Sequence, residues 1–296
     1  MTQSDEEQSP KDERPGDAAA GDVDAPAPAM SSNEPSTEGA KENPEAPTRG
    51  RRRREGLPRR RRGGPEAEER IDFGTKDDRP EGWWAIRFWR AVVILLSRLY
   101  HQLSVRTRNP LPASGAAILV SNHISALDPV LLSAASPRLI IWMMAREYYD
   151  LKSLNWFFKI VRAIPVTRGA HDTSATRLAI RALHAGRVLG VFPEGRIETS
   201  EELLPFHIGV AMMAIKTGVP VYPAYLEGTT RGKEMVQAVA LPNVITLQFG
   251  PKIEFDRTDS SKEGLAKATE AIQAAVETLR QREIETRARL AKAAVS

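Results

Sequence analysis

Short apolar runs alternate with helical patterns between residues 105 and 250, and this alternation restricts the folds open to the chain. The apolar runs have the length of buried strands, and they lie at 116–120, 139–144, 164–167, 188–192, 219–226 and 244–249. Segments with helical patterns lie between them, at 128–135, 154–161, 173–185 and 206–216. Strands that alternate with helices build a largely parallel sheet with helices on its faces, so an α/β fold is predicted.

Polar residues follow two of these predicted strands. His123 comes shortly after the run at 116–120, and Glu194 comes shortly after the run at 188–192. In a parallel sheet of this kind, active groups belong at the carboxyl ends of the strands. We therefore expect His123 and Glu194 to lie at the same edge of the sheet.

His123 and Asp128 are separated by four residues in the run Ser121–Asp128, directly before Pro129. Imidazole is the side chain best suited to take a proton from a hydroxyl at neutral pH, and a nearby carboxylate can hold its tautomer and stabilise the imidazolium. The chain has no Cys and no Gly-x-Ser-x-Gly turn, so the pair would activate a substrate hydroxyl rather than a protein nucleophile. On its own, a His-x4-Asp pair is more often structural than catalytic. Asp128 and Pro129 also predict the start of a helix, with Asp128 as its N-cap.

Further motifs follow this run along the chain. They are a strand ending in Arg168, the sequence Phe192-Pro193-Glu194-Gly195, and the pattern Val219-Pro220-x-x-Pro223. Together with Asn122-His123-x4-Asp128, in this order and spacing, they resemble the motif blocks of the lysophospholipid acyltransferase family. The resemblance covers about residues 80–260.

The resemblance implies acyl transfer from a thioester to a glycerol hydroxyl, and the type member of the family makes phosphatidate from lysophosphatidate. His123 would take the hydroxyl proton, and Asp128 would orient His123 and stabilise its charge, without a covalent acyl-enzyme. Backbone N–H groups near Gly195 are candidates for the oxyanion site. The acyl donor would be acyl-CoA or acyl-carrier protein, which the sequence does not distinguish. No cofactor is implied, and the scattered His residues predict no metal site.

The acceptor that the resemblance implies is a lysophospholipid, which carries a phosphate. Arg168 and Arg196 would bind this phosphate, because guanidinium matches phosphate geometry with two parallel hydrogen bonds. Glu194 and Gly195 would complete the acceptor site, with Glu194 either binding the acceptor or organising the loop. A purely structural ion pair between Arg168 and Glu194 is the alternative.

The sequence departs from the usual family pattern at two places. The commonest third block reads Phe-Pro-Glu-Gly-Thr-Arg, whereas here Arg196 follows Gly195 directly and Ile197 holds the usual Arg position. His207 stands where relatives usually have Lys or Arg. These departures leave open another lysophospholipid or a glycolipid as acceptor. A non-catalytic lipid-surface adaptor is a further alternative, which the intact His-x4-Asp pair disfavours.

The first 72 residues contain no aromatic residue, and Pro, Ala, Ser, Glu and Asp dominate them. Such a segment cannot bury enough apolar surface to offset its ordering entropy, so residues 1–80 are predicted to be a disordered tail, first acidic and then Arg-rich. The Arg block at 49–62 would bind anionic lipid headgroups, bind nucleic acid, or remain solvated. Lipid is favoured because the next segment is membrane-seeking. No aromatic residue interleaves the arginines, so nucleic acid is an unlikely partner.

Residues 83–103 are rich in Trp and aliphatic residues, and Arg87, Arg90 and Arg98 fall within one sector of a helix. The apolar run Ala91–Leu96 is far shorter than the roughly 20 residues that a spanning helix needs. We predict a monotopic helix lying in the membrane interface, with a core helix of the soluble body as the alternative. The charged N-terminus has no apolar stretch of a secretory signal, so the protein is expected on the cytoplasmic face of a membrane.

The predicted organisation has four parts. The tail covers 1–80, the interface helix 81–108, the acyltransferase domain 109–257 and a C-terminal helix 258–296. Apolar residues at helical spacing between Leu265 and Leu279 indicate that the C-terminal helix packs one face on the body.

Overall fold

The computed structural model describes residues 71–73, 83–167, 172–200, 202–232 and 235–295. All of them belong to a unit that spans residues 62–296. The Arg block and most of the predicted tail lie outside the described residues, so the disorder of the tail and its partners stay predictions.

The described residues form a seven-stranded sheet in the order β1-β7-β6-β2-β5-β3-β4. Its strands are β1 (Ser104–Val105), β2 (Ala117–Ser121), β3 (Ile140–Ala145), β4 (Ile164–Val166), β5 (Val188–Val191), β6 (Val221–Glu227) and β7 (Thr246–Phe249). Every neighbouring pair is parallel except β6 and β7. The predicted α/β class with a largely parallel sheet is therefore confirmed, and β1, which is only two residues long, is the strand that the apolar pattern missed.

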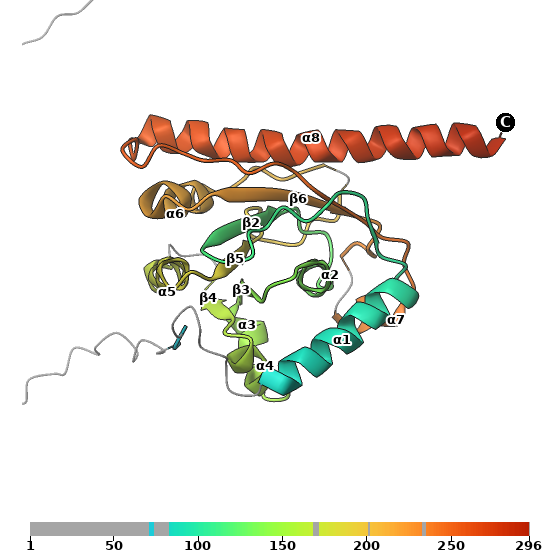
Figure 1. The fold of residues 1–296 in the computed structure, drawn as a ribbon, viewed down its shortest axis with the longest axis horizontal. Helices are drawn as coiled ribbons and strands as arrows, with labels where there is room; N and C mark the ends of the chain where they lie inside the picture. Colours follow the sequence, from blue (N-terminus) through green and yellow to red (C-terminus); the bar gives the residue numbers. More distant parts are fainter. Residues whose placement is uncertain (1–70, 74–82, 168–171, 201, 233–234, 296) are drawn as a thin grey trace, which may run out of the picture. The chain divides into compact units, whose positions relative to one another are not determined.

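Helices cover both faces of the sheet (Figure 1). They are α1 (Trp83–Leu99), α2 (Asp128–Ala135), α3 (Arg146–Tyr149), α4 (Asn155–Ile160), α5 (Thr173–His184), α6 (Gly209–Thr217), α7 (Met235–Ala240) and α8 (Lys262–Val295). The short helices α3 and α7 were not predicted, because a helix of one or two turns leaves too little periodicity to detect.

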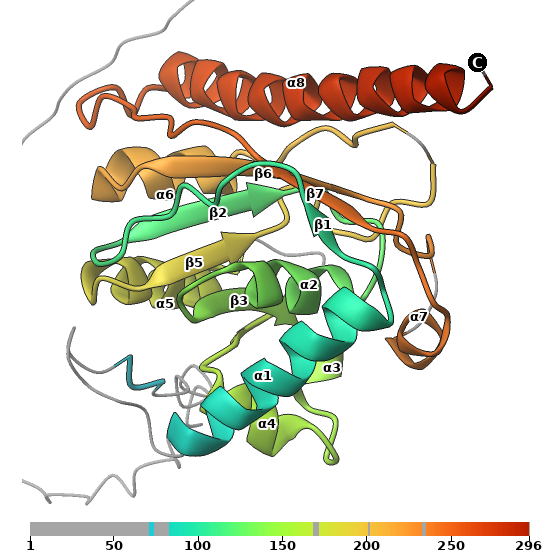
Figure 2. The ribbon, with the colours of Figure 1, turned by 45° about the vertical axis from the view of Figure 1, so that its right-hand side comes forward.

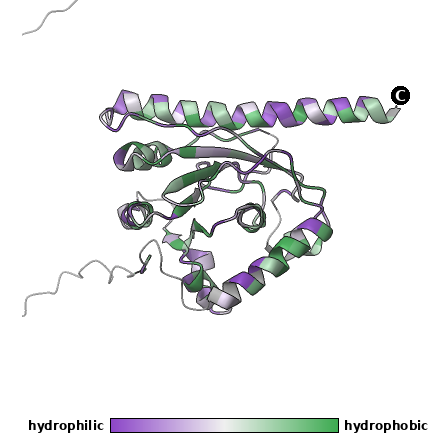
Figure 3. Cartoon of the chain, in the orientation of Figure 1, coloured by the Kyte–Doolittle hydropathy of each residue, from purple (hydrophilic) through white to green (hydrophobic). Residues whose placement is uncertain are grey.

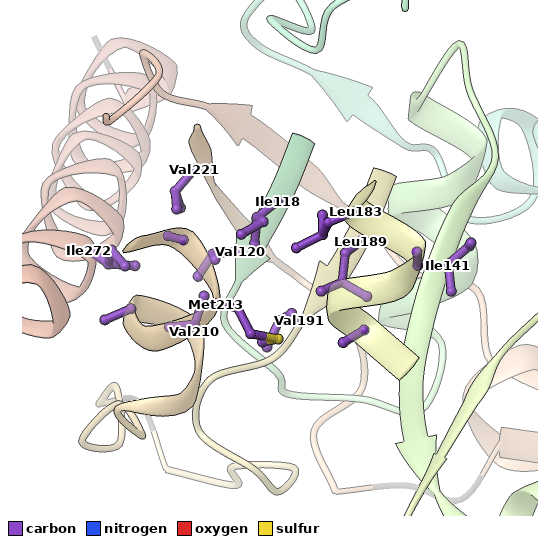
Figure 4. Packing of buried hydrophobic residues seen from close by; sticks show 14 of the residues in the cluster. Ile118, Val120, Ile141, Leu183, Leu189, Val191, Val210, Met213, Val221 and Ile272 are labelled. Atoms are coloured by element: carbon purple, nitrogen blue, oxygen red, sulfur yellow. The ribbon is translucent and has the colours of Figure 1, made fainter. Parts of the chain in front are cut away.

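The core is divided by the sheet into two clusters. Successive side chains of a strand point to opposite faces, and β2 shows this directly. Ile118 and Val120 join the cluster beneath α5, α6 and α8, which Figure 4 shows from close by. Ala117 and Leu119 join the opposite cluster, which includes Leu131 of α2. The strands β2 and β5 are buried along their whole length, which explains why they appear in the sequence as continuous apolar runs.

The helix α1 packs on α2 and keeps its other side open to solvent (Figure 2). The Arg90 guanidinium donates a hydrogen bond to the Ser136 carbonyl at the end of α2. Figure 3 shows hydrophobic and hydrophilic residues together along α1, as expected for an amphipathic helix. None of the helices in the described part of the chain is long and apolar enough to cross a membrane.

Residues 71–73 differ from the predicted tail, because they pack against the body. Ile71 and Phe73 are buried and belong to the cluster beneath α5 and α6. Arg162 and Arg187 both donate hydrogen bonds to the Phe73 carbonyl, at 2.6 and 2.9 Å. Phe73 is the first aromatic residue of the chain, so a boundary drawn there rather than at residue 80 would have placed this segment correctly.

The helix α8 packs its predicted apolar face on the body, and Ile272 and Val276 are fully buried. Two turns further on, Glu283 is also buried. Its carboxylate accepts hydrogen bonds from Thr246 (2.8 Å), Gln248 (2.7 Å) and Arg287 (2.9 Å). Burial alone would raise the pKa of Glu283, but these hydrogen bonds outweigh it and hold the pKa below its usual range. This network fastens α8 to β7.

Candidate active site

The residues that follow β2 are held at the carboxyl end of the sheet, as predicted. Asn122 is buried, and its amide group donates to the Leu226 carbonyl (2.8 Å) and accepts from the Leu226 N–H (2.9 Å). These bonds continue the pairing of β2 with β6 by one residue. Asn122 therefore fixes the point from which His123 projects.

His123 and Asp128 are in direct contact. The Nδ1 atom of His123 lies 3.1 Å from Oδ2 of Asp128, whose side chain is fully buried. The same Oδ2 accepts the backbone N–H groups of Ile124 (2.7 Å) and Ser125 (2.8 Å), and Oδ1 accepts from the Thr229 hydroxyl (3.1 Å). The buried carboxylate is thus paired on every side, which a buried charge requires.

This geometry fixes the tautomer of His123. An Asp carboxylate can only accept, so the Nδ1 atom that faces it carries the hydrogen. The Nε2 atom then holds a lone pair and can accept a proton. This arrangement has the geometry that a general base and its orienting carboxylate would need.

The helix start at Asp128 differs in detail from the prediction. Asp128 is the first residue of α2 and Leu127 is the N-cap, with no side-chain cap. The Asp128 carboxylate turns back to the loop before the helix because His123, Ile124 and Ser125 offer it more donors there. The expectation that Asp128 caps the helix was wrong.

Glu194 is buried and holds two segments of backbone. Its Oε1 accepts from the His123 N–H (3.0 Å), and its Oε2 accepts from the Leu204 N–H (3.3 Å). Burial raises the pKa of Glu194, against these two hydrogen bonds, which lower it. Of the two roles that the sequence left open for Glu194, these contacts support the organisation of the loop.

Gly195 adopts a left-handed conformation with φ of +71°, which suits glycine. A Cβ atom at this position would lie 3.0 Å from the ring of His207, so the loop and His207 are in close contact. The N–H of Gly195 donates to the Phe192 carbonyl (3.1 Å), so this particular N–H is engaged within the loop. It is therefore not the oxyanion donor in this conformation of the loop.

Of the two arginines assigned to the acceptor phosphate, the structure describes only Arg196. The Arg196 side chain is 71% exposed, and its nearest carboxylate is that of Glu198 at 3.9 Å. Arg168 lies outside the described residues, so both its phosphate role and the alternative ion pair with Glu194 stay predictions. Lys216 of α6, which the motifs did not indicate, lines the same cavity as Arg196 and His207.

Comparison with known proteins identifies the family. Residues 102–227 match the protein family described as "Acyltransferase". A 1-acyl-sn-glycerol-3-phosphate acyltransferase of Bacillus subtilis is 28% identical over 190 residues, which are 64% of this chain and 93% of that protein. Residues 102–227 of the chain belong to the acyltransferase family. The protein is an enzyme of lipid metabolism that uses an acyl donor and a lipid acceptor.

Other relatives of this acyltransferase differ in their named acceptors. A lyso-ornithine lipid O-acyltransferase of Pseudomonas aeruginosa is 28% identical over 158 residues, which are 53% of this chain and 56% of that protein. Among solved structures, the 1-acyl-sn-glycerophosphate acyltransferase PlsC of Thermotoga maritima matches with a TM-score of 0.53 and 23% identity, over 67% of this chain and 82% of that one. The structural likeness establishes a shared fold.

A large cavity adjoins the dyad of the acyltransferase. Its volume is about 2090 Å³, and its walls include His123, Gly195 and Arg196 as well as apolar residues of β3 and α4. Pockets for drug-sized ligands are about 300–1,000 Å³, so this one has room for a lipid-sized substrate. Among the described residues, no group of three His, Asp or Glu side chains lies close enough together to hold a metal ion.

Sequence reasoning missed several residues that shape this site. Thr229 completes the environment of Asp128, but it lies 101 positions away and no motif marks it. Trp142 stacks on Phe192, which in turn stacks on the His123 ring, and Trp142 also belongs to no motif. Only the fold brings these side chains to the dyad.

Proposed function

We propose that this glycerolipid acyltransferase moves a fatty acyl group from a thioester donor to the free hydroxyl of a lysophospholipid. The favoured acceptor is 1-acylglycerol-3-phosphate, and the product is phosphatidate. The observation that carries the proposal is the contact between His123 Nδ1 and the buried Asp128 carboxylate at 3.1 Å, beside a lipid-sized cavity. The named activity of the Bacillus subtilis relative supports the choice of acceptor.

In the proposed reaction, Nε2 of His123 takes the proton of the acceptor hydroxyl while the hydroxyl oxygen attacks the thioester carbonyl carbon. A C–O bond forms, the C–S bond breaks, and the proton passes from His123 to the sulfur of the leaving thiolate. Asp128 stabilises the imidazolium that exists between these steps. A positioned general base of this kind contributes about 10²–10⁴-fold to the rate.

The acceptor phosphate is assigned to the basic residues beside the Phe-Pro-Glu-Gly loop. Arg196 is exposed at the cavity wall, and its ion pair with Glu198 at 3.9 Å leaves other guanidinium N–H groups to bind a phosphate. Arg168 is assigned to the same phosphate from the sequence motif. Glu194 supports this site indirectly. Its carboxylate accepts hydrogen bonds from the backbone N–H groups of His123 and Leu204, so it is not assigned to the phosphate.

A different lyso-lipid acceptor is the second candidate. His207 contacts Gly195 where relatives usually carry Lys or Arg, and Ile197 replaces the usual Arg. The Pseudomonas aeruginosa relative is named for lyso-ornithine lipid, an acceptor other than lysophosphatidate. A non-catalytic adaptor has less support, because the dyad is intact and its tautomer is set for proton transfer.

We also propose that α1 lies in the membrane interface, on the cytoplasmic face. Its exposed apolar residues include Trp84, Phe88, Leu95 and Leu99, and at 100° per residue they fall within about 60° around the helix axis. Such a stripe, with Arg98 beside it, fits the boundary between headgroups and acyl chains. Several residues of α1 also line the cavity, so a lipid in the membrane would have a short path to His123.

The test is a product assay with defined acceptors. Purified protein is incubated with labelled acyl-CoA, or with acyl-carrier protein, and a panel that includes lysophosphatidate, other lysophospholipids and lyso-ornithine lipid. Labelled phosphatidate from the wild type, and none from His123→Ala, is expected. Transfer to every acceptor except lysophosphatidate would favour the second candidate, and equal turnover by His123→Ala would remove the dyad from the mechanism.

A further inference from the structure

Three aromatic rings form a continuous stack that begins at His123. The ring centroids of His123 and Phe192 are 4.0 Å apart with 13° between their planes. The centroids of Phe192 and Trp142 are 4.7 Å apart with 11° between their planes. Phe192 is part of a motif, whereas Trp142 is not. The stack reaches from the catalytic loop into β3.

The register of the sheet explains how Trp142 reaches Phe192. Trp142 of β3 is paired with Gly190 of β5, and Gly190 lies two residues before Phe192 on the same face. A Cβ atom at position 190 would lie 2.5 Å from Trp142 Cε3 and 2.6 Å from Cζ3. The indole ring therefore occupies the space that any other residue at position 190 would fill. Only glycine lets Trp142 lie across β5 and stack on Phe192.

The far edge of Trp142 is fastened to α2. Its Nε1 donates to the Ser133 hydroxyl (3.0 Å), and that hydroxyl donates to the Pro129 carbonyl (2.6 Å). The helix α2 also begins with Asp128, which holds Nδ1 of His123. The helix α2 therefore holds both groups that restrain the imidazole. Asp128 contacts its Nδ1 atom directly, and Trp142 acts on its face through Phe192.

We propose that Trp142 is a positioning residue for His123, which acts through Phe192 to fix the plane of the imidazole ring. The inference rests on the proposed role of His123 as general base. A hydrogen bond at Nδ1 restrains one atom of the ring but leaves the ring free to tilt about that contact. A ring stacked on its face prevents the tilt, so Nε2 keeps its direction towards the acceptor hydroxyl. The stacked face also favours the imidazolium during the reaction, because aromatic faces attract cations.

The experiment compares Trp142→Leu with the conservative variant Trp142→Phe. A displacement of about 1 Å at a reacting group costs on the order of 10²-fold in rate, so Trp142→Leu should lower kcat by about ten- to a hundredfold. The KM values for donor and acceptor should stay within about twofold, because the dyad rather than the substrate is displaced. Trp142→Phe keeps a stacking ring and should recover most of the lost kcat.

Gly190→Ala disturbs the same stack by adding an atom instead of removing a ring. Its methyl group would have to displace the indole of Trp142 and Cγ2 of Ile140, which would lie 2.7 Å away, so kcat should fall here as well. If both changes act through one stack, the double variant Gly190→Ala with Trp142→Leu should lose little more than the worse single variant. Ser133→Ala removes only the anchor of the indole and should give a smaller loss, which keeps the proposal testable if Trp142→Leu does not fold.

Several outcomes would overturn the proposal. Trp142 lines the cavity, so a raised acceptor KM at unchanged kcat would make it a wall of the substrate site instead. Equal losses in Trp142→Phe and Trp142→Leu would show that stacking is irrelevant. His123→Ala is measured alongside, with thermal unfolding of every variant. An active His123→Ala overturns the proposed function itself, whereas an inactive His123→Ala with a fully active Trp142→Leu overturns only the positioning role.

Discussion

Replacing Asp128 by Asn should separate the charge of this side chain from its hydrogen bonds. The amide oxygen of Asn can take the place of Oδ2, which accepts from His123, Ile124 and Ser125. The amide NH₂ then replaces Oδ1 and faces the Thr229 hydroxyl, which can accept as well as donate. The reverse orientation would set the NH₂ against two backbone N–H groups. The loop and the tautomer of His123 should therefore survive while the negative charge is lost.

The expected loss of activity comes from the imidazolium. At a separation of 3.1 Å, a full charge pair is worth about 5 kcal/mol at an effective dielectric constant of about 20. Hydrogen bonds to charged groups contribute about 1.5–3 kcal/mol net, since desolvation offsets part of the attraction. A loss of that size in the transition state lowers kcat by roughly ten- to 150-fold. The free energy of unfolding should change by less than about 1 kcal/mol, because no buried donor is left without an acceptor.

The assay measures kcat and KM for Asp128→Asn and Asp128→Ala, together with denaturant unfolding. Asp128→Ala leaves the buried N–H groups of Ile124 and Ser125 without their acceptor, at about 1–3 kcal/mol each, so it should be much less stable than the Asn variant. A wild-type kcat in Asp128→Asn would mean that no imidazolium needs stabilising. An Asn variant as unstable as the Ala variant would refute the assignment of its hydrogen bonds.

Three further changes test other parts of the molecule. Arg196→Ala should raise the acceptor KM by about tenfold, and an equal rise in the donor KM would contradict its assignment to the phosphate. Because the folded pKa of Glu283 is depressed, its stabilising contribution is complete above the unfolded value of about 4.3 and is lost as pH falls through the folded pKa. Unfolding curves of wild type and Glu283→Gln should therefore converge at acid pH, and a constant gap would exclude this network as the cause. Serine at both Leu95 and Leu99 should weaken co-sedimentation with anionic vesicles, whereas serine at the exposed Leu290 of α8 is the control and should have no effect.

The fold was predictable because strands such as β2 and β5 are buried on both faces. Such strands appear in the sequence as continuous apolar runs, and the run at 188–192 matches β5 (Val188–Val191) within one residue. The meeting of His123 and Glu194 was also predictable, because parallel strands bring their carboxyl ends to one edge. Both conclusions depend on the order of the elements and not on details of packing.

Details that depend on register or on competition between partners were not predictable. Sequence patterns of helix starts predicted Asp128 as a helix cap. Its carboxylate instead accepts hydrogen bonds from three donors in the preceding loop. The stack on His123 depends on the pairing of Trp142 with Gly190, which links strands that are distant in the sequence. Phe73 packs on the body although the segment around it is rich in charge, because a single large aromatic side chain outweighs the local composition.

The loop from His123 to Ser125 lies between β2 and α2, where neither a strand nor a helix supplies partners for its backbone. Its N–H groups donate instead to two motif carboxylates, those of His123 to Glu194 and those of Ile124 and Ser125 to Asp128. Its carbonyls accept from the neighbouring loops, that of His123 from Glu198 (2.7 Å) and that of Ile124 from Gly232 (3.1 Å). A carboxylate beside the proposed phosphate site would repel the acceptor, so Glu194 is best explained by its hydrogen bonds to backbone N–H groups. The two acidic motif residues then share one task, which is to fix the short loop that carries His123.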